Sequence, residues 1–365
     1  MRRPGSAQST TQGSAQSTTQ GSAQSTTQGS AQSTTRGSAQ STTQGSARCM
    51  RQEAATIEVM DERLIDELRA IAPTKTDEPL SRHTTFGIGG PADAFVTVRS
   101  GQELARAVMI AREFGAPVFI LGAGSNVLVG DAGIRGVVID NQAKAVTVAP
   151  EDGVARLTAE SGVSFAALAR QMAREGWAGI EWAAGIPGTL GGAVVYNAGA
   201  YDGCLADVLV SASVLNGGNA TKTLTNAELR FSYRNSIFTR GDCAGCVVLS
   251  VEMALTRGDA AALVAKVTDY DRMRLEAQPR GRNSGSTFKN PPGDQAWRLI
   301  DATGLRGHRI GNARISEKHC NFFENLGEAR AADVAALMRE AQGRVKAQFG
   351  IELENEVELV GEGFE

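Results

Sequence analysis

The chain has 365 residues, which is long enough for two or three domains. Residues 1–48 contain four arginines and no acid, so removing their charge from the net −3 leaves about −7 for the rest. That balance excludes a general nucleic-acid binder. No apolar run reaches the roughly 18 residues that a bilayer-spanning helix needs, so we expect no membrane partner. The five cysteines lack the spacing of a disulfide framework, which favours the reducing cytoplasm.

Residues 1–48 consist mainly of five copies of the octapeptide Gly-Ser-Ala-Gln-Ser-Thr-Thr-Gln, with Arg36 ending the fourth copy. The unit has no large apolar residue that could offset the entropy lost on ordering, so it predicts disorder. A flexible tether is one alternative, and a translation start at Met50 or Met60 is another. We expect no secretory signal, because no apolar segment follows the first arginines.

From residue 59 the apolar pattern becomes that of a globular protein. It predicts a helix over 59–71, a strand over 94–98, a helix over 102–114, and strands over 117–121 and 136–139. Further on it predicts strands near 153–159, 207–215 and 246–255, and helices over 164–175 and 188–197. The last elements are helices over 260–277 and 330–348 and a strand over 351–360.

This order of elements divides the chain into four expected segments. They are the disordered repeat over 1–48, two α/β lobes over 59–143 and 144–258, and a linker helix with a C-terminal domain over 259–365. The oligomeric state stays open.

Residues 121–131, Leu-Gly-Ala-Gly-Ser-Asn-Val-Leu-Val-Gly-Asp, form a glycine-rich loop after a predicted strand. Gly122 and Gly124 permit backbone N–H groups to approach a phosphate closely, and Ser125 and Asn126 add donors. Val127 replaces the third glycine of a Rossmann fingerprint, and no Walker A lysine follows. A plain turn between strands explains this loop equally well.

A second glycine loop spans residues 185–201. Four glycines around Pro187 expose backbone at the start of a predicted short helix, whose amides and positive end suit a pyrophosphate. Small residues continue beyond them and leave room for a flat ring system. The alternative is close packing of a helix on a sheet.

Residues 280–290, Arg-Gly-Arg-Asn-Ser-Gly-Ser-Thr-Phe-Lys-Asn, place Ser286 in a Gly/Asn-rich turn. Such a turn presents a hydroxyl to a bound anion, while the flanking cations Arg280, Arg282 and Lys289 hold the charge of that anion. Together with the two glycine loops, this segment indicates a cofactor enzyme with two anionic ligands.

Six motifs follow one another in a recognisable order. They are T-T-F-G-I-G-G-P-A-D (84–93), L-G-A-G-S-N-V-L-V (121–129), G-I-P-G-T-L-G-G-A-V-V-Y-N-A-G-A-Y (185–201), F-S-Y-R-N-S-I-F (231–238), G-S-T-F-K-N-P (285–291) and L-E-N-E-V (353–357). In this order they resemble the UDP-N-acetylenolpyruvoylglucosamine reductase (MurB) family over residues 59–361. The first two alone resemble only the wider family of flavin-binding oxidoreductases. The length and the lack of a further substrate-capping insertion resemble the shorter, type II subtype.

The resemblance implies an α+β / α/β fold of several subdomains: a two-lobed FAD-binding (PCMH-type) domain plus a C-terminal α/β substrate-binding domain. It implies a cytoplasmic enzyme with non-covalent FAD and NADPH as co-substrate. The enzyme would reduce the enolpyruvyl ether of UDP-N-acetylglucosamine-enolpyruvate to UDP-N-acetylmuramate for peptidoglycan synthesis, with the hydride coming from reduced FAD. The implied FAD-binding residues are Thr85, Gly122, Ala123, Gly124, Ser125, Asn126, Gly185, Ile186, Pro187, Gly188, Gly191, Gly192 and Asn197.

Three catalytic residues are implied by the same motifs. Ser286 matches the proton donor, Arg234 the clamp on the substrate carboxylate, and Glu356 a third catalytic residue paired with Arg234. Alternation alone places four glutamates on one face of the terminal strand and cannot select among them. Tyr233, Lys289 and Asn290 are the implied substrate-binding residues. On the residues alone, Ser286 could cap a turn, Arg234 could lie on the surface, and Lys289 could be solvated.

Three local features stand apart from the resemblance. The segment A-Y-D-G-C-L (200–205) departs from the family pattern, which puts the shape of that turn in doubt, and Cys320 stands where a small residue is usual. Cys243-Ala-Gly-Cys246 lacks the second ligand pair of a zinc site, so we expect buried or incidental thiols and no metal.

Two competing functions fit part of the pattern. A different flavin oxidase fits the first two motifs, and a non-catalytic nucleotide-binding module fits only the glycine loops.

Overall fold

The computed structural model describes residues 60–365, so the predicted disordered repeat over 1–48 and the alternative start at Met50 lie outside the described residues. The first helix, α1 (Glu62–Ile71), begins slightly later than predicted because the Asp61 side chain caps it. None of the described helices is long and apolar enough to cross a membrane.

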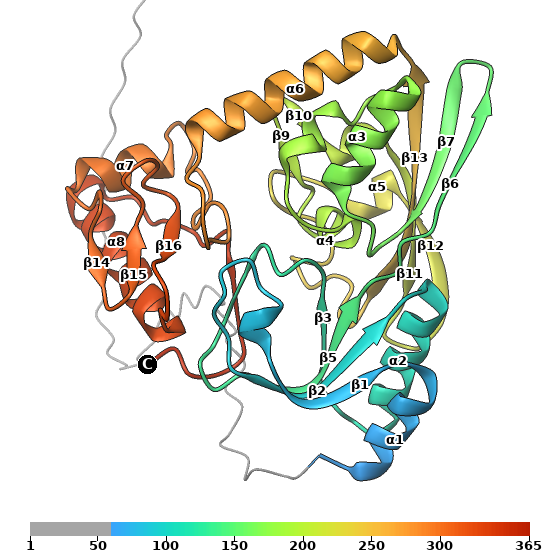
Figure 1. The fold of residues 1–365 in the computed structure, drawn as a ribbon, viewed down its shortest axis with the longest axis horizontal. Coiled ribbons are helices and arrows are strands. Elements are labelled where there is room, and N and C mark those ends of the chain that lie inside the picture. Colours follow the sequence, from blue (N-terminus) through green and yellow to red (C-terminus); the bar gives the residue numbers. More distant parts are fainter. Residues whose placement is uncertain (1–59) are drawn as a thin grey trace, which may run out of the picture. The chain divides into compact units, whose positions relative to one another are not determined.

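The first sheet has four strands in the order β1-β2-β5-β3 (Figure 1). Its elements are β1 (Thr74–Pro79), β2 (Pro91–Val98), α2 (Gly101–Glu113), β3 (Val118–Leu121) and β5 (Ile134–Asn141), with η1 (Leu80–Arg82) after β1. Strands β2 and β3 run parallel to β5, and β1 is antiparallel to β2. Helices α1 and α2 pack Leu68 and Leu104 against Val96 and Ile139 of one face. The predicted strands and helix of this region are confirmed.

The second sheet is antiparallel, in the order β12-β11-β13-β7-β6. Its strands are β6 (Val146–Glu151), β7 (Val154–Glu160), β11 (Leu209–Leu215), β12 (Thr221–Thr225) and β13 (Val247–Arg257), and β8 (Trp177–Ala178) pairs with the end of β13. The helices of this region are α3 (Phe165–Glu175), η2 (Glu181–Gly185), α4 (Leu190–Val195), η3 (Leu205–Asp207) and α5 (Asn226–Leu229). Leu168 and Leu190 pack into its core, and the predicted strands near 153–159, 207–215 and 246–255 are confirmed.

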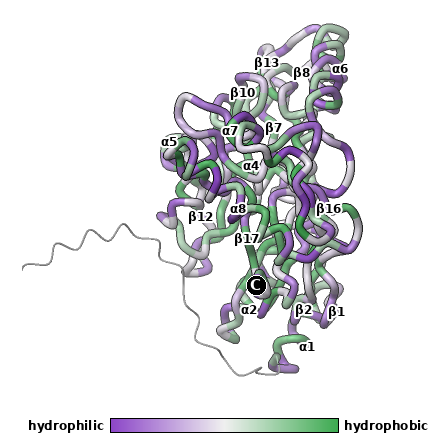
Figure 2. Tube along the Cα trace, turned by 90° about the vertical axis from the view of Figure 1, so that its left-hand side faces the viewer, coloured by the Kyte–Doolittle hydropathy of each residue, from purple (hydrophilic) through white to green (hydrophobic). Residues whose placement is uncertain are grey.

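Helix α6 (Ala260–Ala277) links this region to the C-terminal elements, as Figure 1 shows. Of its residues only Leu263 and Val267 are buried, and its tube in Figure 2 accordingly mixes hydrophilic and hydrophobic residues. The helix ends just before Gln278, because the residue preceding a proline avoids the helical conformation. The chain then enters the segment that carries Ser286.

The C-terminal elements are α7 (Ala296–Ala302), β14 (Arg309–Ile310), β15 (Ala313–Ile315), β16 (Phe323–Asn325), α8 (Ala331–Phe349) and β17 (Glu358–Val360). Their core contains Leu299, Leu337 and Phe288, and it also includes Phe86 and Leu128 from the N-terminal part of the described chain. Strand β17 pairs in parallel with β4 (Val127–Val129), which lies within the first glycine loop, directly after Asn126. The end of the chain is therefore anchored beside that loop.

The terminal strand predicted over 351–360 is wrong for most of its length, since only Glu358–Val360 is a strand. Its partner β4 has three residues, so pairing cannot extend further. The preceding residues instead lie along 287–289, where the Lys289 N–H donates to the Glu354 carbonyl and the Glu356 N–H to the Thr287 carbonyl. Leu359, on the face opposite the four glutamates, is 37% exposed and so is not part of the core.

The expectation of free thiols is wrong at Cys243 and Cys246, which form a disulfide in the structure. The two cysteines are three residues apart in a turn that ends where β13 begins. This turn holds their Cα atoms 5.4 Å apart, which is within the range of a disulfide. Cys320 is buried, as expected of a packing residue.

Candidate active site

A cavity of about 620 Å³ is lined by β3 and the loop after it, by α4, by the end of α6 and by the C-terminal segment. This volume is typical of a site for a cofactor or small molecule. Both glycine loops line it, together with Ser284 to Ser286, Arg234 and Glu356. The structure thus brings together segments that are separated by more than 200 residues in the sequence.

The first glycine loop needs its glycines for steric reasons. Gly124 has a φ of +61°, and a Cβ there would lie 2.2 Å from the carbonyl oxygen of His83. A Cβ on Gly122 would lie 2.5 Å from the Thr189 hydroxyl oxygen, which belongs to the second loop. The two loops therefore touch, and their backbones rather than side chains form this wall of the cavity.

The second glycine loop combines packing with open backbone. Gly191 fits the packing explanation, because its N–H donates to the Ser161 carbonyl at 2.8 Å and a Cβ would lie 3.0 Å from the Ser161 side chain. Gly188 has a φ of +125°, which only glycine adopts readily. The space around Gly192 is open, because a Cβ there would meet nothing closer than the Thr189 hydroxyl oxygen at 3.8 Å. This glycine is the one for which packing offers no explanation.

Three residues implied for FAD lie outside the lining of the cavity. The Thr85 hydroxyl donates to the Asn283 carbonyl at 2.8 Å, and the Asn197 amide donates to the Ser232 carbonyl at 3.1 Å. Gly185 is covered by the Arg274 side chain, whose Cδ would lie 2.9 Å from a Cβ there. These contacts hold the loops in place, and a direct role of the three residues in FAD binding stays a prediction.

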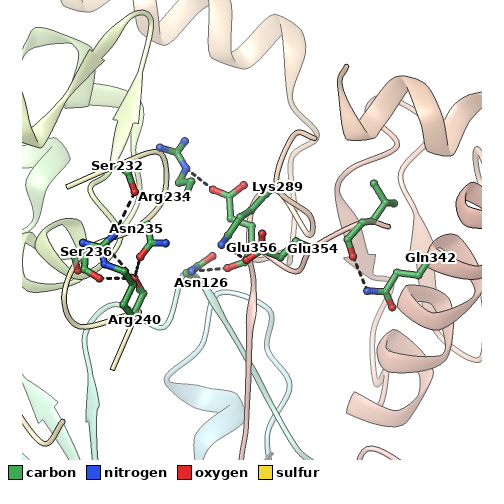
Figure 3. Close-up of polar contacts among 12 residues, drawn as sticks. Asn126, Ser232, Arg234, Asn235, Ser236, Arg240, Lys289, Gln342, Glu354 and Glu356 are labelled. Atoms are coloured by element: carbon green, nitrogen blue, oxygen red, sulfur yellow. Dashed lines mark hydrogen bonds and ion pairs between the residues drawn. The ribbon is translucent and has the colours of Figure 1, made fainter. Parts of the chain in front are cut away.

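Arg234 and Glu356 form an ion pair that faces the cavity (Figure 3). The Arg234 Nε donates to the Glu356 Oε1 at 2.7 Å, and its Nη2 donates to the Gly199 carbonyl at 2.9 Å. Only 22% and 17% of the two side chains are exposed. Burial raises the pKa of Glu356, while the charge and hydrogen bond of Arg234 and the charge of Lys289 oppose that rise. The pair expected from the family motifs is thus present.

Ser286 pairs with Phe322 through a single antiparallel bridge, and it lines the cavity. Its hydroxyl makes no hydrogen bond to any residue between 60 and 365, so it does not cap the turn in which it lies. The neighbouring Asn283 does that instead, accepting from the Gly285 N–H at 3.0 Å. The Ser286 hydroxyl is therefore available to a ligand.

The residues implied for substrate binding lie beside the cavity rather than in its wall. Lys289 pairs with Glu354, and the Asn290 side chain accepts from the Ala296 N–H at 3.1 Å. Tyr233 is 58% exposed, and its ring lies 5.3 Å from the guanidinium carbon of Arg234. Their contact with substrate stays a prediction.

Arg274, near the end of α6, is a cavity residue that the sequence pattern did not reveal. Its guanidinium has no hydrogen-bond or ion-pair partner in the described part of the chain, and burial lowers its pKa. By contrast, Arg280 and Arg282, the expected cations, do not line the cavity. Helical spacing shows which residues of α6 share a face with Arg274, but it does not show which face of the helix lies toward the cavity. The sequence therefore could not identify Arg274 as a cavity residue.

The departing segment 200–205 forms a two-residue hairpin between β9 (Gly199–Ala200) and β10 (Gly203–Cys204). Tyr201 and Asp202 occupy the turn with φ of +51° and +65°, the signs that a type I′ turn requires. The Tyr201 ring stacks on Tyr270 of α6 at 4.4 Å and lines the cavity. The doubt about this turn is thereby resolved in favour of a tight hairpin.

This site accommodates a dinucleotide cofactor. The glycines of both loops leave backbone uncovered in the cavity wall, which suits phosphate groups, and the open space at Gly192 leaves room for a flat ring. An unpaired cation, an ion pair and a free hydroxyl then complete the same cavity. This combination of groups suits an anionic ligand.

Comparisons with known proteins agree with this description. Residues 92–224 match an FAD binding domain, and residues 277–360 match the C-terminal domain of UDP-N-acetylenolpyruvoylglucosamine reductase. A UDP-N-acetylenolpyruvoylglucosamine reductase of Rubrobacter xylanophilus is 45% identical over 294 residues, 80% of this chain and 97% of its own. The reductase 2 of Symbiobacterium thermophilum is 42% identical over 303 residues, 83% of this chain and 97% of its own.

A solved structure gives the same result. The crystal structure of UDP-N-acetylenolpyruvylglucosamine reductase from Thermus caldophilus has 36% identity and a TM-score of 0.67, covering 80% of this chain and all of that one. The expected fold class, an FAD-binding PCMH-type domain plus a C-terminal domain with mixed α/β structure, is confirmed. A different oxidase and a non-catalytic module are no longer needed as explanations. The chain belongs to the UDP-N-acetylenolpyruvoylglucosamine reductase family, FAD-binding oxidoreductases that serve as UDP-N-acetylmuramate dehydrogenases in peptidoglycan precursor synthesis.

Proposed function

We propose that this protein uses NADPH to reduce UDP-N-acetylglucosamine-enolpyruvate to UDP-N-acetylmuramate, with Arg234, Ser286 and Glu356 as its catalytic residues. The observation that carries the proposal is that the Arg234–Glu356 pair and the unpaired Ser286 hydroxyl face one cavity, together with both glycine loops. An anion clamp and a proton donor thus lie beside a cofactor site.

Arg234 is the clamp for the substrate carboxylate. Its Nε and Nη2 are held by Glu356 and by the Gly199 carbonyl, which leaves Nη1 without a partner among residues 60–365. A guanidinium fixed in this way can donate to a carboxylate oxygen without first losing side-chain freedom. It also stabilises the negative charge that grows on the carboxylate when the neighbouring double bond is reduced.

Ser286 is the proton donor. Reduction of the enolpyruvyl double bond leaves negative charge on the carbon next to the carboxylate, and this carbon must accept a proton. A serine hydroxyl is a weak acid in water, so it serves here only because the carbon is strongly basic and the hydroxyl is positioned beside it. Glu356 holds Arg234 in place, and its carboxylate balances the charge of the guanidinium.

FAD would be held without a covalent bond by the backbone of Gly122 to Asn126 and of Ile186 to Gly192. No His or Cys lies in the 121–131 loop to form a covalent link. When bound, FAD would supply hydride transfer from NADPH to the substrate.

Arg274 would bind a phosphate of the UDP-sugar, since it is the unpaired cation in the wall of the cavity. Tyr233, Lys289 and Asn290 would contact the same substrate from the rim. The short C-terminal region, with no inserted element between α7 and α8 beyond three short strands, supports the type II subtype. A cytoplasmic location fits a substrate of this kind.

The direct test is product formation. The purified protein, loaded with FAD, is incubated anaerobically with NADPH and UDP-N-acetylglucosamine-enolpyruvate, and the products are identified by mass spectrometry. We expect a product two hydrogen atoms heavier than the substrate, with one NADPH consumed per molecule formed. NADPH consumption that does not depend on the enolpyruvyl group, tested with UDP-N-acetylglucosamine, would refute the substrate assignment.

A further inference from the structure

Tyr196 and Glu358 form a second pair in the wall of the cavity, beside Arg234 and Glu356. Tyr196 is the residue that ends α4 in the second glycine loop, and Glu358 is the first residue of β17. The Tyr196 hydroxyl donates a hydrogen bond to the Glu358 carboxylate. The contact thus joins the second glycine loop to the C-terminal segment.

Glu358 differs from the other glutamates of its segment. Glu352 pairs with Lys346, Glu354 with Lys289, and Glu356 with Arg234. Within residues 60–365, Glu358 has no basic partner, and the Tyr196 hydroxyl is the side chain that contacts its carboxylate. A surface ion pair therefore does not explain its position.

Tyr196 is suited to remain a donor. Burial raises the pKa of its phenol, and the charge of Glu358 raises it further, so the hydroxyl stays protonated near neutral pH. A hydrogen bond from a neutral donor to a carboxylate is among the stronger kinds in proteins. Tyr196 therefore keeps the proton with which it bonds to Glu358.

The same segment is held from the first glycine loop by its backbone. The Glu358 N–H donates to the Asn126 carbonyl at 3.0 Å. The Asn126 side chain donates to the Glu356 carbonyl at 3.0 Å, as Figure 3 shows. Glu358 also pairs in register with Val127 of β4. Both glycine loops therefore hold residues 356–358. The first loop does so through Asn126, and the second loop through the Tyr196 hydroxyl.

We infer that Tyr196 and Glu358 are positioning residues that couple occupancy of the FAD-binding loops to the placement of Glu356. Ligand contact that fixes the second glycine loop fixes Tyr196, and the hydrogen bond then fixes Glu358, two residues from Glu356. Both glutamates line the cavity. The inference rests on the proposed catalytic role of Glu356.

Hydrogen exchange tests the coupling directly. Amide exchange of residues 353–360 is measured by mass spectrometry in the FAD-free protein and in the FAD-loaded protein. In the unmodified chain we expect FAD to slow exchange of this segment. Tyr196→Phe, which keeps the ring and loses the donor, should lose most of this FAD-dependent protection. The control, Glu352→Gln, alters a glutamate outside the cavity and should keep it.

Kinetics separate positioning from general damage. Tyr196→Phe and Glu358→Ala should each lower kcat about tenfold, the value expected from losing one hydrogen bond to a charged group, while KM for NADPH stays unchanged. Glu358→Gln retains an acceptor and should recover most of the rate. The double variant Tyr196→Phe/Glu358→Ala should be no slower than either single variant, because the two residues act through one bond.

FAD-dependent protection that is equal in Tyr196→Phe and the unmodified chain would overturn the coupling. Should Tyr196→Phe fail to fold, Glu358→Ala provides the same comparison. If Tyr196→Phe loses the FAD-dependent protection but keeps its kcat, the positioning role is overturned. In that case the hydrogen bond exists as described, and the role assigned to Glu356 is wrong. Product formation by the unmodified chain, measured in the same experiment, keeps both results separate from the assignment of substrate.

Discussion

At the scale of single residues, the site depends on charges that are held in a partly buried place. Arg234 and Glu356 neutralise each other, Arg274 has no partner among the described residues, and Ser286 has a free hydroxyl. Unpaired groups of this kind are costly in a folded protein unless a ligand uses them. Their gathering in one cavity is therefore the mark of a binding site.

Loss of the Arg234 charge should raise the pKa of Glu356 further, because burial would then act with less opposition. An acid whose pKa is higher in the folded state than in the unfolded state loses stability as pH rises from the unfolded pKa to the folded pKa. The free energy of unfolding of Arg234→Gln should thus fall below that of the unmodified chain from about pH 4 upward. Above the new pKa of Glu356 the deficit should stay constant at about 3 kcal/mol.

Denaturant unfolding of both proteins across this pH range measures the difference. A deficit that is the same at acidic and neutral pH would show that Glu356 does not titrate as described. Arg240→Gln, which removes an arginine from the same loop outside the cavity lining, serves as the control.

Loss of the Arg274 charge should weaken binding of the UDP-sugar. Arg274→Gln is expected to raise KM for that substrate about tenfold or more, since charge-assisted contacts to phosphate are strong, with a smaller change in kcat. Arg272→Gln is the matched control, because Arg272 lies on the same helix but pairs with Asp269 and Glu276 at the surface. Equal KM values in the two variants would remove Arg274 from the proposed site.

At the scale of elements, the two glycine loops form the site by backbone geometry. Their glycines avoid contacts at which any Cβ would collide with the neighbouring loop or with residues 83–84. The C-terminal segment then closes the wall through β4–β17 pairing and the contacts of Asn126. These contacts set the backbone path of both loops along the wall of the cavity.

Gly124 of the first loop can be compared with Gly115, which follows α2 and has a similar backbone conformation. Gly124 and Gly115 have φ of +61° and +68°, but a Cβ on Gly124 would meet the His83 carbonyl at 2.2 Å, whereas one on Gly115 would meet nothing within 4 Å. Gly124→Ala should lose FAD binding by at least tenfold, while Gly115→Ala should cost only about 1 kcal/mol of stability from its backbone strain. Fluorescence titration with FAD and thermal unfolding distinguish the two. Equal FAD affinities would contradict the steric account.

Most of the helices and both glycine loops were predictable from the sequence. Helical spacing located α2, α3, α6 and α8, and glycine-rich segments located both loops, because these signals are local. The extent of β17 was not predictable, since it depends on a three-residue partner that is 231 residues earlier in the chain at Val127. Likewise nothing in the sequence near Arg274 or Glu358 says which side of its element faces the cavity. Such residues are determined by tertiary packing.

At the scale of the whole molecule, the described chain brings segments that are distant in the sequence to one cavity. The glycine loops supply backbone donors, α6 supplies Arg274, and the segments around Ser286 and Glu356 supply the chemistry. The family membership shows what reaction such an arrangement serves. These segments divide the tasks among them, so flavin binding and proton delivery depend on different residues.

This division is tested most directly by Ser286→Ala in anaerobic stopped-flow absorbance. The protein loaded with FAD is first reduced with NADPH and then mixed with UDP-N-acetylglucosamine-enolpyruvate, while the absorbance of the bound flavin is followed. We predict that Ser286→Ala binds FAD and is reduced by NADPH at normal rates. Its reoxidation by substrate should be slower by roughly 10²–10⁴-fold, the usual contribution of a positioned acid. Reoxidation at the rate of the unmodified protein would contradict the account, because Ser286 would then not be the proton donor.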